Sequence, residues 1–533
     1  MANILQTRKK IIVPVDGASN IKLEALDFDT LTTVFSRSTE TPVKEVDGLQ
    51  YNRTGEECRW FDRIIAELPA EMRDVNVIAP VARGVSGGLV GSGNTLMEVP
   101  GEELTLSYTQ EYSDAVENAF RELAGDSRGF FLETGSVRDF QGSLTLIKRF
   151  VFEELERPEL LAQAEYFGTY GALMSGHFLG DDYLRAVRSC GNEHSYWMCH
   201  SGARNINEAP GMPSSLAMKI PSFKRLVPES PSTAYVSLGN MPAAQADAIG
   251  ITGDCLVIPG GHDTCLSHIP VMSTFYQAFE EKSGTPVIHV EAGSWTLVAS
   301  IGGNVELPQD GYKRDIVVQG TVDGTPVVTA RYGGGNDFRH VKSLIEERGM
   351  RFGGVPDMRM LENVLEDSDC FVLPNIHPVN HTTGPFPELR GKIINERKFF
   401  NLSENPEKAY IIANLTTSIT TAYQIENMAR GVDSDIVITA GGSKDPLWGG
   451  LLATLTGKNV YAMFDREGNA VTETTTLGAA ITGKAAYLNT HPYEVDVSGL
   501  GVNYRQIQPF GGDIPRKLEK YRAAFMRGCT PGH

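Results

Sequence analysis

The sequence has no hydrophobic run long enough to cross a membrane. Its first apolar run, Ile11 to Val15, follows two lysines but stops at Asp16, too early for the hydrophobic part of a secretory signal. Positive charge is also scarce, and the formal net charge of −18 argues against a nucleic-acid or anionic-membrane surface. We therefore expect a cytoplasmic protein with no membrane partner and no nucleic-acid partner.

Paired cysteine and histidine motifs are missing too. The seven cysteines are scattered and none has the Cys-x-x-Cys spacing, so we expect them to be reduced rather than bridged. The histidine-containing segments NEHSYWMCH and HPVNH lack the ligand spacing of a zinc site. The sequence contains no Walker A motif, which excludes the usual phosphate-binding loop of that class.

The length of 533 residues is too great for one hydrophobic core, so at least two domains are expected. Hydrophobic content of 41% and charged content of 21% are ordinary for a globular enzyme. The change in pattern near His268 predicts one domain over residues 1–267 and a second over 268–533.

The most informative segment runs from residue 436 to 465. It predicts a buried strand from Ile436, a turn of small residues, a helix from Pro446 that ends at Gly457, and a second strand. Asp445 is placed to cap the helix. A small-residue turn between a strand and a helix lets a flat or anionic group lie against bare backbone N–H groups. An ordinary tight connection explains such a turn equally well.

Two further segments repeat the order of strand, small-residue turn and functional side chains. They are CLVIPGGHDTCLSH at 255–268 and PVIHVEAGSWTLVASIGG at 286–303. Together the three segments resemble the FGGY carbohydrate kinases, nearest the rhamnulokinase and fuculokinase branch, where GHDT and an SGTW-like segment also occur. The resemblance is clear from about residue 255 to Tyr487. It implies an α/β fold of two actin-like (ribonuclease-H-like) ATPase domains facing across a cleft, with sugar binding in the first domain and nucleotide binding in the second.

Asp263 is the candidate catalytic residue. Phosphoryl transfer to a hydroxyl needs a carboxylate that orients the alcohol and takes its proton, and the resemblance gives this role to the aspartate of GHDT. The alternative is an Asp that merely forms a turn after Gly-Gly. His262 is expected to bind the sugar or to steady Asp263, and a purely structural histidine remains open.

The resemblance assigns ATP binding to residues in three segments. These are Gly17, Ser19, Asn20 and Lys22; Gly293, Ser294 and Thr296; and Gly441, Gly442, Ser443 and Asp445. In the last segment Ala440 replaces the family's first glycine. Asp445 stands where the branch often has Asn, so its capping role competes with a direct contact to the nucleotide.

The first of these segments departs from the family pattern, because Asp16 runs directly into Gly17 and one residue is missing. The resemblance implies that Asp16 holds Mg²⁺ through water and that Lys22 reaches the γ-phosphate of ATP. A plain Asp-Gly hairpin turn is the alternative.

Arg83 and Gly84 lie where related kinases place sugar-binding residues, although only Gly84 clearly matches. Arg83 is either a sugar ligand or a surface cation.

Two glycine-rich stretches are less informative. GGLVGSGN at 87–94 resembles a dinucleotide-binding fingerprint, but no helix-forming run follows it. The glycine-rich stretch 331–338 has no role that the sequence assigns.

These observations predict an ATP- and Mg²⁺-dependent kinase that phosphorylates a small-molecule sugar, such as a ketose or deoxyketose. Two alternatives stay open: an actin-fold nucleotide-binding protein without kinase activity, and an NAD-dependent dehydrogenase. The sequence leaves the sugar, the hydroxyl and a homodimeric state undecided.

Overall fold

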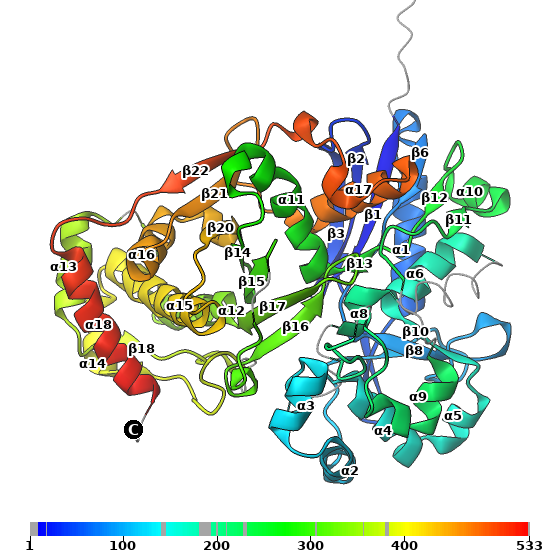
Figure 1. Ribbon diagram of the computed structural model, residues 1–533, viewed down its shortest axis with the longest axis horizontal. Helices are drawn as coiled ribbons and strands as arrows, with labels where there is room; N and C mark the ends of the chain where they lie inside the picture. The colour runs from blue at the N-terminus through cyan, green and yellow to red at the C-terminus, as the bar shows by residue number, and fades with distance from the viewer. Residues whose placement is uncertain are drawn as a thin grey trace, which may run out of the picture. The chain divides into compact units, whose positions relative to one another are not determined.

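The protein is described by a computed structural model that covers residues 9–17, 19–139, 145–180, 193–198, 201–208, 211–227, 232–303, 306–354, 356–378 and 383–530. The chain forms two compact units (Figure 1). The first unit comprises residues 1–277, 317–327 and 473–501, and the second comprises 278–316, 328–472 and 502–533.

The first unit is built on an eight-stranded sheet with the order β11-β12-β6-β1-β2-β3, in which β7 also pairs with β1, and β13 pairs with β7. Its strands are β1 (Lys10–Asp16), β2 (Asn20–Asp27), β3 (Thr33–Glu40), β6 (Val75–Ile78), β7 (Val81–Ala82), β11 (Gly239–Asn240), β12 (Leu256–Val257) and β13 (Gly261–His262). The predicted hairpin over residues 10–30 is confirmed, because β1 and β2 pair antiparallel from Lys10↔Asp27 to Asp16↔Ile21.

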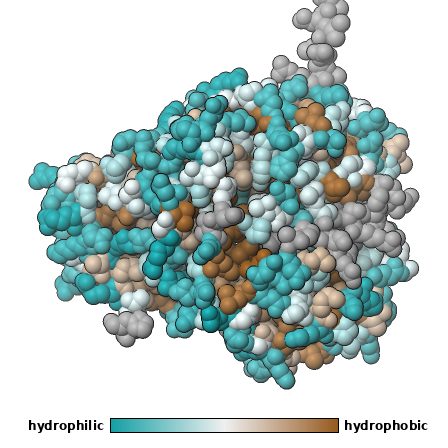
Figure 2. All heavy atoms as spheres, viewed as in Figure 1, coloured by the Kyte–Doolittle hydropathy of each residue, from teal (hydrophilic) through white to brown (hydrophobic). Residues whose placement is uncertain are grey.

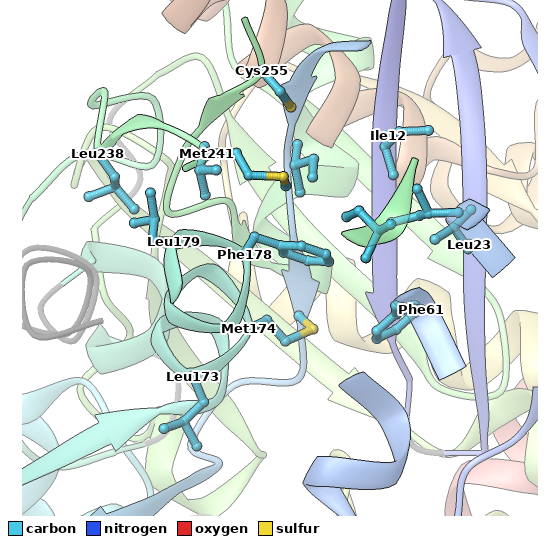
Figure 3. Close-up of a cluster of buried hydrophobic side chains, with 14 of the residues drawn as sticks. Ile12, Leu23, Phe61, Leu173, Met174, Phe178, Leu179, Leu238, Met241 and Cys255 are labelled. Atoms are coloured by element: carbon cyan, nitrogen blue, oxygen red, sulfur yellow. The ribbon is translucent and has the colours of Figure 1, made fainter. Parts of the chain in front are cut away.

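Helices cover both faces of this sheet, as the near-continuous apolar sequence of β1 requires. Ile12 points to the face covered by α1 (Thr54–Ala66) and α6 (Tyr170–Leu179), where it joins Phe61 and Phe178 in one buried cluster (Figure 3). Ile11 points the other way, toward Gly483 of α17 (Thr474–Leu488). The alternation follows the period-2 geometry of a strand.

Further helices and two small sheets complete the first unit. The helices are α2 (Asp114–Ala124), α3 (Ser127–Thr134), α4 (Leu146–Glu156), α5 (Pro158–Gln163), α8 (His194–Met198), α9 (Pro221–Leu226), α10 (Ala243–Ile249) and α11 (Asp263–Ala278). The small sheets are β4 (Val43–Val46), β5 (Leu49–Asn52) and β9 (Thr105–Leu106), and β8 (Gly87–Val90) with β10 (Tyr166–Thr169).

The second unit contains most of a seven-stranded sheet with the order β16-β17-β15-β14-β20-β21-β22. Its strands are β14 (Val287–Ala292), β15 (Thr296–Ile301), β16 (Ile316–Gly320), β17 (Pro326–Tyr332), β20 (Asp435–Ala440), β21 (Val460–Phe464) and β22 (Asn503–Ile507). The helices are α12 (Gly334–Glu346), α13 (Met358–Glu366), α14 (Glu396–Leu402), α15 (Pro406–Met428), α16 (Pro446–Thr456) and α18 (Ile514–Cys529), with a small β18 (Phe371–Val372) and β19 (Ile393–Ile394) pair.

The two sheets repeat one pattern of strands. In the first, β3, β2 and β1 pair antiparallel, and then β1, β6 and β12 pair parallel. In the second, β17, β15 and β14 pair antiparallel, and then β14, β20 and β21 pair parallel. The repeat has no counterpart in the sequence, where no internal repeat of fixed period is visible.

The helix predicted after residue 445 is confirmed in detail. Asp445 caps α16 by accepting the N–H groups of Leu447 and Trp448 through Oδ1, at 3.0 and 3.2 Å. Gly457 ends the helix in the left-handed conformation, with φ 64°, which a glycine adopts without strain.

The units differ from the predicted boundary at 267/268. The first unit continues to residue 277 because α11 is one uninterrupted helix. Residues 473–501 also belong to it, since α17 packs on β1 and β6 at Gly483 and approaches the Leu266 backbone of α11 at Gly478. Tertiary packing of this kind leaves no local mark in a sequence.

Surface and thiol properties agree with the composition. The face drawn in Figure 2 is mainly hydrophilic, with hydrophobic side chains in smaller patches. Among the described residues, no helix is long and apolar enough to span a membrane. Cys58, Cys255, Cys265, Cys370 and Cys529 are free and buried, whereas Cys190 and Cys199 lie outside the described residues.

Candidate active site

Three strands of the first unit end side by side, and a charged residue follows or closes each of them. β7 pairs parallel with both β1 and β13, with Val15 opposite Val81 and His262 opposite Ala82. Because the carboxyl ends of parallel strands meet at one edge of a sheet, Asp16, Arg83 and Asp263 gather there. The sequence predicted a role for each of these three residues.

Asp263 begins α11, and its carboxylate is held through one oxygen. Oδ1 accepts hydrogen bonds from the Thr264 N–H at 2.6 Å and the Thr264 hydroxyl at 3.3 Å, and it lies 2.9 Å from His262 Nε2. The side chain remains 40% exposed. Among the described residues these contacts all involve Oδ1, so Oδ2 is the oxygen that can accept from a hydroxyl.

The charge state of Asp263 suits a proton acceptor. Burial raises its pKa, but the His262 charge and the hydrogen bonds from His262 and Thr264 outweigh that effect and leave the pKa below the ordinary value. The carboxylate is therefore ionised at neutral pH. Both residues come from the predicted GHDT segment, and His262 lies against Asp263 as the sequence suggested.

Glycine is required in the turn that leads to this carboxylate. Gly260 has φ 68°, and a Cβ there would lie 1.7 Å from the Pro80 carbonyl oxygen. No side chain can be accommodated at that distance, because the contact is with backbone. The Gly-Gly sequence therefore lets the chain pass β7 and deliver His262 and Asp263 to the sheet edge.

Asp16 and Arg83 form a buried ion pair. Asp16 Oδ2 accepts from Arg83 Nε at 2.8 Å, and Oδ1 accepts from Nη2. Asp16 is fully buried and Arg83 is 6% exposed. Arg83 is therefore not the surface cation that the sequence left open, and a sugar-binding role for it and for Gly84, which begins the next turn, stays a prediction.

Further polar groups surround the guanidinium of Arg83. Nη1 donates to Asn52 Oδ1 at 3.2 Å, Nη2 lies 3.7 Å from Glu57 Oε1, and the group lies 5.4 Å from the Tyr170 ring centroid. Tyr170 donates its hydroxyl hydrogen to Glu57 Oε2. The sequence did not predict that Asn52, Glu57 and Tyr170 belong to the site. The one feature that could have indicated it is Glu57, a charged residue on the buried face of α1.

Glu57 is one of the titratable groups that this environment affects strongly. Burial, and then the charge of Asp16, raise its pKa from 4.5 to about 8, although Arg83 opposes the shift. Asp16 likewise has a raised pKa, caused first by burial. The cluster thus contains two carboxyls and one counter-charge.

We expect the stability of the protein to depend on pH through Glu57. A folded pKa above the unfolded value means that the folded state holds the proton more tightly, so this stabilisation is complete below pH 4.5 and is lost as pH rises through about 8. The loss should be on the order of a few kcal/mol. Glu57→Gln should flatten the dependence in urea unfolding from pH 5 to 8, and an unchanged slope would contradict the assignment.

The segment from Asp16 to Lys22, which the family resemblance predicts to be the first phosphate loop, forms the tight turn that its missing residue predicted. The Gly17 N–H donates to the Asn20 carbonyl at 3.1 Å, and Thr41 donates to the carbonyls of Ser19 and Gly17 at 3.1 and 2.8 Å. Lys22 lies on β2, where its Nζ contacts Glu473 and lies 3.4 Å from Glu24. Contact of this loop with a γ-phosphate stays a prediction.

A cavity of about 330 Å³ in the second unit brings together the other two segments that were predicted to bind ATP. It is lined from the β14–β15 turn, from the turn after β20 and from the helices α12, α15 and α16. Predicted residues on its wall are Gly293, Ser294, Thr296, Gly441, Gly442 and Asp445. Ser443 lies in the same turn, where its hydroxyl donates to the Ala440 carbonyl at 2.7 Å.

The glycine-rich stretch 331–338 also belongs to this cavity. Gly334, Gly335 and Phe338 line it. The Asn336 N–H donates to the Ser294 carbonyl at 3.0 Å, and a Cβ at Gly335 would lie 2.0 Å from the Gly293 carbonyl oxygen. The start of α12 therefore supports the β14–β15 turn at backbone distance. The glycines of this stretch are visible in the sequence, but nothing there indicates that they contact the β14–β15 turn.

Asp445 is occupied by structural contacts. Its Oδ1 caps α16, and its Oδ2 accepts the Tyr410 hydroxyl. The capping interpretation is confirmed, and contact with a nucleotide stays a prediction.

Ala440 has φ 58° and ψ −144°, a conformation that favours glycine. Alanine in place of the family's first glycine therefore leaves strain in this turn.

Comparison with known families gives a match over most of the second unit and short parts of the first. Residues 284–489 match the carbohydrate kinase FGGY family, C-terminal domain. Over this segment the chain is similar to the FGGY carbohydrate kinases. The segment includes the β14–β15 turn and the turn after β20, so the cavity lies within the FGGY-matched segment. A comparison with curated proteins gives no match.

Solved structures share the fold over nearly the whole chain. A carbohydrate kinase from Novosphingobium aromaticivorans has a TM-score of 0.74 and 19% identity, covering 98% of both chains. A ligand-bound xylulose kinase from Lactobacillus acidophilus has 0.72 and 14%, and a gluconate kinase from the same organism has 0.69 and 15%, each covering 98% of this chain and 97% of its own.

These likenesses confirm the predicted α/β fold with two actin-like, ribonuclease-H-like domains. The FGGY match and the kinase neighbours also support a phosphotransferase enzyme. The rhamnulokinase and fuculokinase branch is not confirmed, since the neighbours are named as xylulose and gluconate kinases. The dehydrogenase alternative fails: residues 87–90 form β8, which pairs antiparallel with β10 rather than opening a nucleotide-binding helix.

Asp16 is not arranged to bind Mg²⁺ in this structure, because it is paired with Arg83. Both carboxylate oxygens accept from Arg83, and a cation placed there would meet the guanidinium charge. Among the described residues no group of three or more His, Cys, Asp or Glu side chains could hold a metal. We therefore derive no step through a protein-bound metal.

Proposed function

We propose that the protein is an ATP-dependent sugar kinase that transfers the γ-phosphoryl group to a hydroxyl of a ketose or deoxyketose. The observation that carries the proposal is Asp263, an ionised and partly exposed carboxylate with Oδ2 open to a hydroxyl. The glycine-lined cavity of the FGGY-matched segment supports ATP as the donor.

In the proposed reaction Asp263 orients the sugar hydroxyl and takes its proton on Oδ2. A bond forms between the sugar oxygen and the γ-phosphorus, and the bond from that phosphorus to the bridging oxygen of ADP breaks. His262 and Thr264 hold Oδ1 and so fix the direction of Oδ2. Backbone N–H groups near Gly293 and Gly441 hold the nucleotide, and Lys22 meets its γ-phosphate.

The experiment is a screen for ADP release from ATP over ketoses, pentoses and polyols. Sugar-dependent release is expected, and it should disappear in an Asp263→Asn variant. Release that no sugar stimulates would contradict the proposal. The cytoplasmic location remains a prediction of the sequence, and a homodimeric state stays open.

A non-catalytic nucleotide-binding protein is the second candidate. The specific observation in its favour is the Asp16–Arg83 pair, which occupies the aspartate that the family resemblance assigns to Mg²⁺. This candidate expects ATP binding with no sugar-dependent release of ADP. The same screen, run beside an ATP-binding measurement, therefore separates the two functions.

We expect Gly293→Ala to weaken ATP binding at least about tenfold, which is about 1.4 kcal/mol. A Cβ at Gly293 would meet only the Trp295 carbonyl oxygen, at 3.5 Å, so the protein should accommodate the methyl group. The methyl would instead occupy cavity space against the backbone. Calorimetric titration with ATP provides the affinity.

Gly511→Ala is the matched control, because a Cβ there meets nothing within 4 Å and Gly511 does not line the cavity. It should bind ATP as the unmodified protein does. Equal affinities for both variants would show that the nucleotide does not approach the β14–β15 turn.

A further inference from the structure

A buried carboxyl and a buried hydroxyl lie directly beneath the His262 backbone. Ser195 Oγ accepts a hydrogen bond from the His262 N–H at 2.9 Å and donates its own hydrogen to Glu193 Oε2 at 2.5 Å. Both Glu193 and Ser195 are fully buried. Neither residue belongs to a segment that the sequence or the family resemblance associated with the site.

Glu193 is held as firmly as the hydroxyl that it binds. Its Oε2 also accepts from the N–H groups of Ser195 and Tyr196, at 3.0 and 3.3 Å, at the start of α8. These bonds fix the Glu193 carboxyl to the first turn of a helix. The Ser195 hydroxyl is therefore kept in one orientation, with its lone pairs directed at β13.

The approach of Ser195 to β13 depends on Gly261. A Cβ at Gly261 would lie 3.3 Å from Ser195 Oγ and 3.2 Å from Leu266 Cγ, which is tighter than most contacts. The glycine lets the hydroxyl reach the next N–H along the chain. The second glycine of the Gly-Gly turn thus has a role distinct from that of Gly260.

The His262 ring completes a connection to Asp263. Nε2 lies 2.9 Å from Asp263 Oδ1, and Nδ1 lies 3.4 Å from Cys265 Sγ. Nε2–H donates to the carboxylate, and Nδ1 is the ring nitrogen that faces Cys265. The connected groups are then Glu193, Ser195, the His262 backbone, the His262 ring and Asp263.

We propose that Glu193 and Ser195 are positioning residues, which hold β13 so that His262 keeps Asp263 oriented and ionised. The proposal rests on the proposed kinase function, because the benefit of that orientation is proton transfer from a sugar hydroxyl. It adds a buried support that acts through His262 and does not touch the substrate.

Several titratable groups surround this connection. The pKa of Glu193 is raised to about 8, first by burial and against its bonds from Ser195. His268 on α11 is buried, and its pKa is lowered to about 3 by burial and then by His262. Cys265 faces the ring, and Asp16 acts on Asp263 through its charge. The pH test below therefore follows the acid limb of the profile, well below the pKa of Glu193.

The test is the pH profile of kcat/KM for Ser195→Ala. Without the Ser195 hydroxyl the His262 N–H loses its acceptor, and the hydrogen bond from the His262 ring to Asp263 should weaken. The pKa of Asp263 should then rise, which moves the acid limb of the kcat/KM profile up by about one pH unit. We expect kcat to fall about tenfold, with the KM for ATP unchanged. Glu193→Gln keeps an acceptor in the same place and should move the limb less than Ser195→Ala does.

Ser214→Ala is the matched control. Ser214 is also fully buried, donates to the Gly202 carbonyl at 2.8 Å and accepts the Ala217 N–H at 3.1 Å, away from β13. It should lower the melting temperature without moving the acid limb. In a His262→Ala background, adding Ser195→Ala should not move the acid limb further, because the imidazole that links Ser195 to Asp263 is already absent.

A readout without turnover separates this proposal from the kinase proposal. Nitrogen-15 NMR of labelled histidines, with the His262 signal assigned from its loss in His262→Ala, should show the Nε2 hydrogen bond weakened by Ser195→Ala but not by Ser214→Ala. Absence of sugar-dependent ADP release in the unmodified protein would overturn the kinase function alone. An unchanged His262 signal and an unmoved acid limb in Ser195→Ala would overturn the positioning role.

Discussion

Replacing Asp263 by asparagine is expected to lower kcat by about 10²- to 10⁴-fold, the range typical for loss of a general base. The amide oxygen of Asn can still accept from His262 and Thr264 in place of Oδ1. The amide nitrogen, however, replaces Oδ2 with a donor that cannot take a proton. The local structure should therefore persist while proton transfer fails.

Two measurements check this expectation. ATP affinity should be unchanged, because the cavity that would hold the nucleotide is lined entirely by residues of the second unit. Asp254→Asn makes the same chemical change at an exposed position of the first unit and should leave kcat unaltered. An Asp263→Asn enzyme that works at near the original rate would remove Asp263 from the mechanism.

Local patterns carried the family resemblance from which most of the candidate site was predicted. Asp263, Gly293 and Gly441 lie in segments where a short apolar strand leads into a small-residue turn, and such a strand–turn unit is written in consecutive residues. The cap at Asp445 and the end of α16 at Gly457 were predictable for the same reason. The structure places the two ATP segments of the second unit on one cavity.

Long-range partners could not be predicted in this way. Glu57 and Tyr170 reach Arg83 from α1 and α6, and Ser195 reaches His262 across 67 positions of sequence. Each is an ordinary residue in its own segment, and only tertiary packing brings it to the sheet edge. For the same reason the sequence treated Arg83 as a side chain that could face solvent.

The end of β1 shows how a distant residue can neutralise a buried carboxylate. Asp16 closes β1 and is fully buried, and a buried carboxylate needs a counter-charge. Arg83 supplies it from the end of β7, the neighbouring parallel strand.

Replacing Arg83 by methionine is therefore expected to destabilise the protein by about 3–5 kcal/mol at neutral pH, as removal of one member of a buried pair typically does. Asp16 and Glu57 would share the site without a cation, and both would hold protons more tightly when folded. Because their folded pKa values lie above the unfolded ones, the lost stability should return as pH falls toward about 4. Urea unfolding between pH 4 and 8 gives the free energies.

Arg59→Met is the control for this loss. Arg59 pairs with Glu103 on the surface, with side chains 62% and 61% exposed, so the change should cost no more than about 1 kcal/mol at any pH. A double variant, Arg83→Met with Asp16→Asn, should recover part of the loss at pH 8, since it removes one of the two uncompensated charges. If Arg83→Met alone is as stable as the unmodified protein at pH 8, Arg83 is not the counter-charge that the buried carboxylates need, and Asp16 becomes available again as the metal-binding residue of the first phosphate loop.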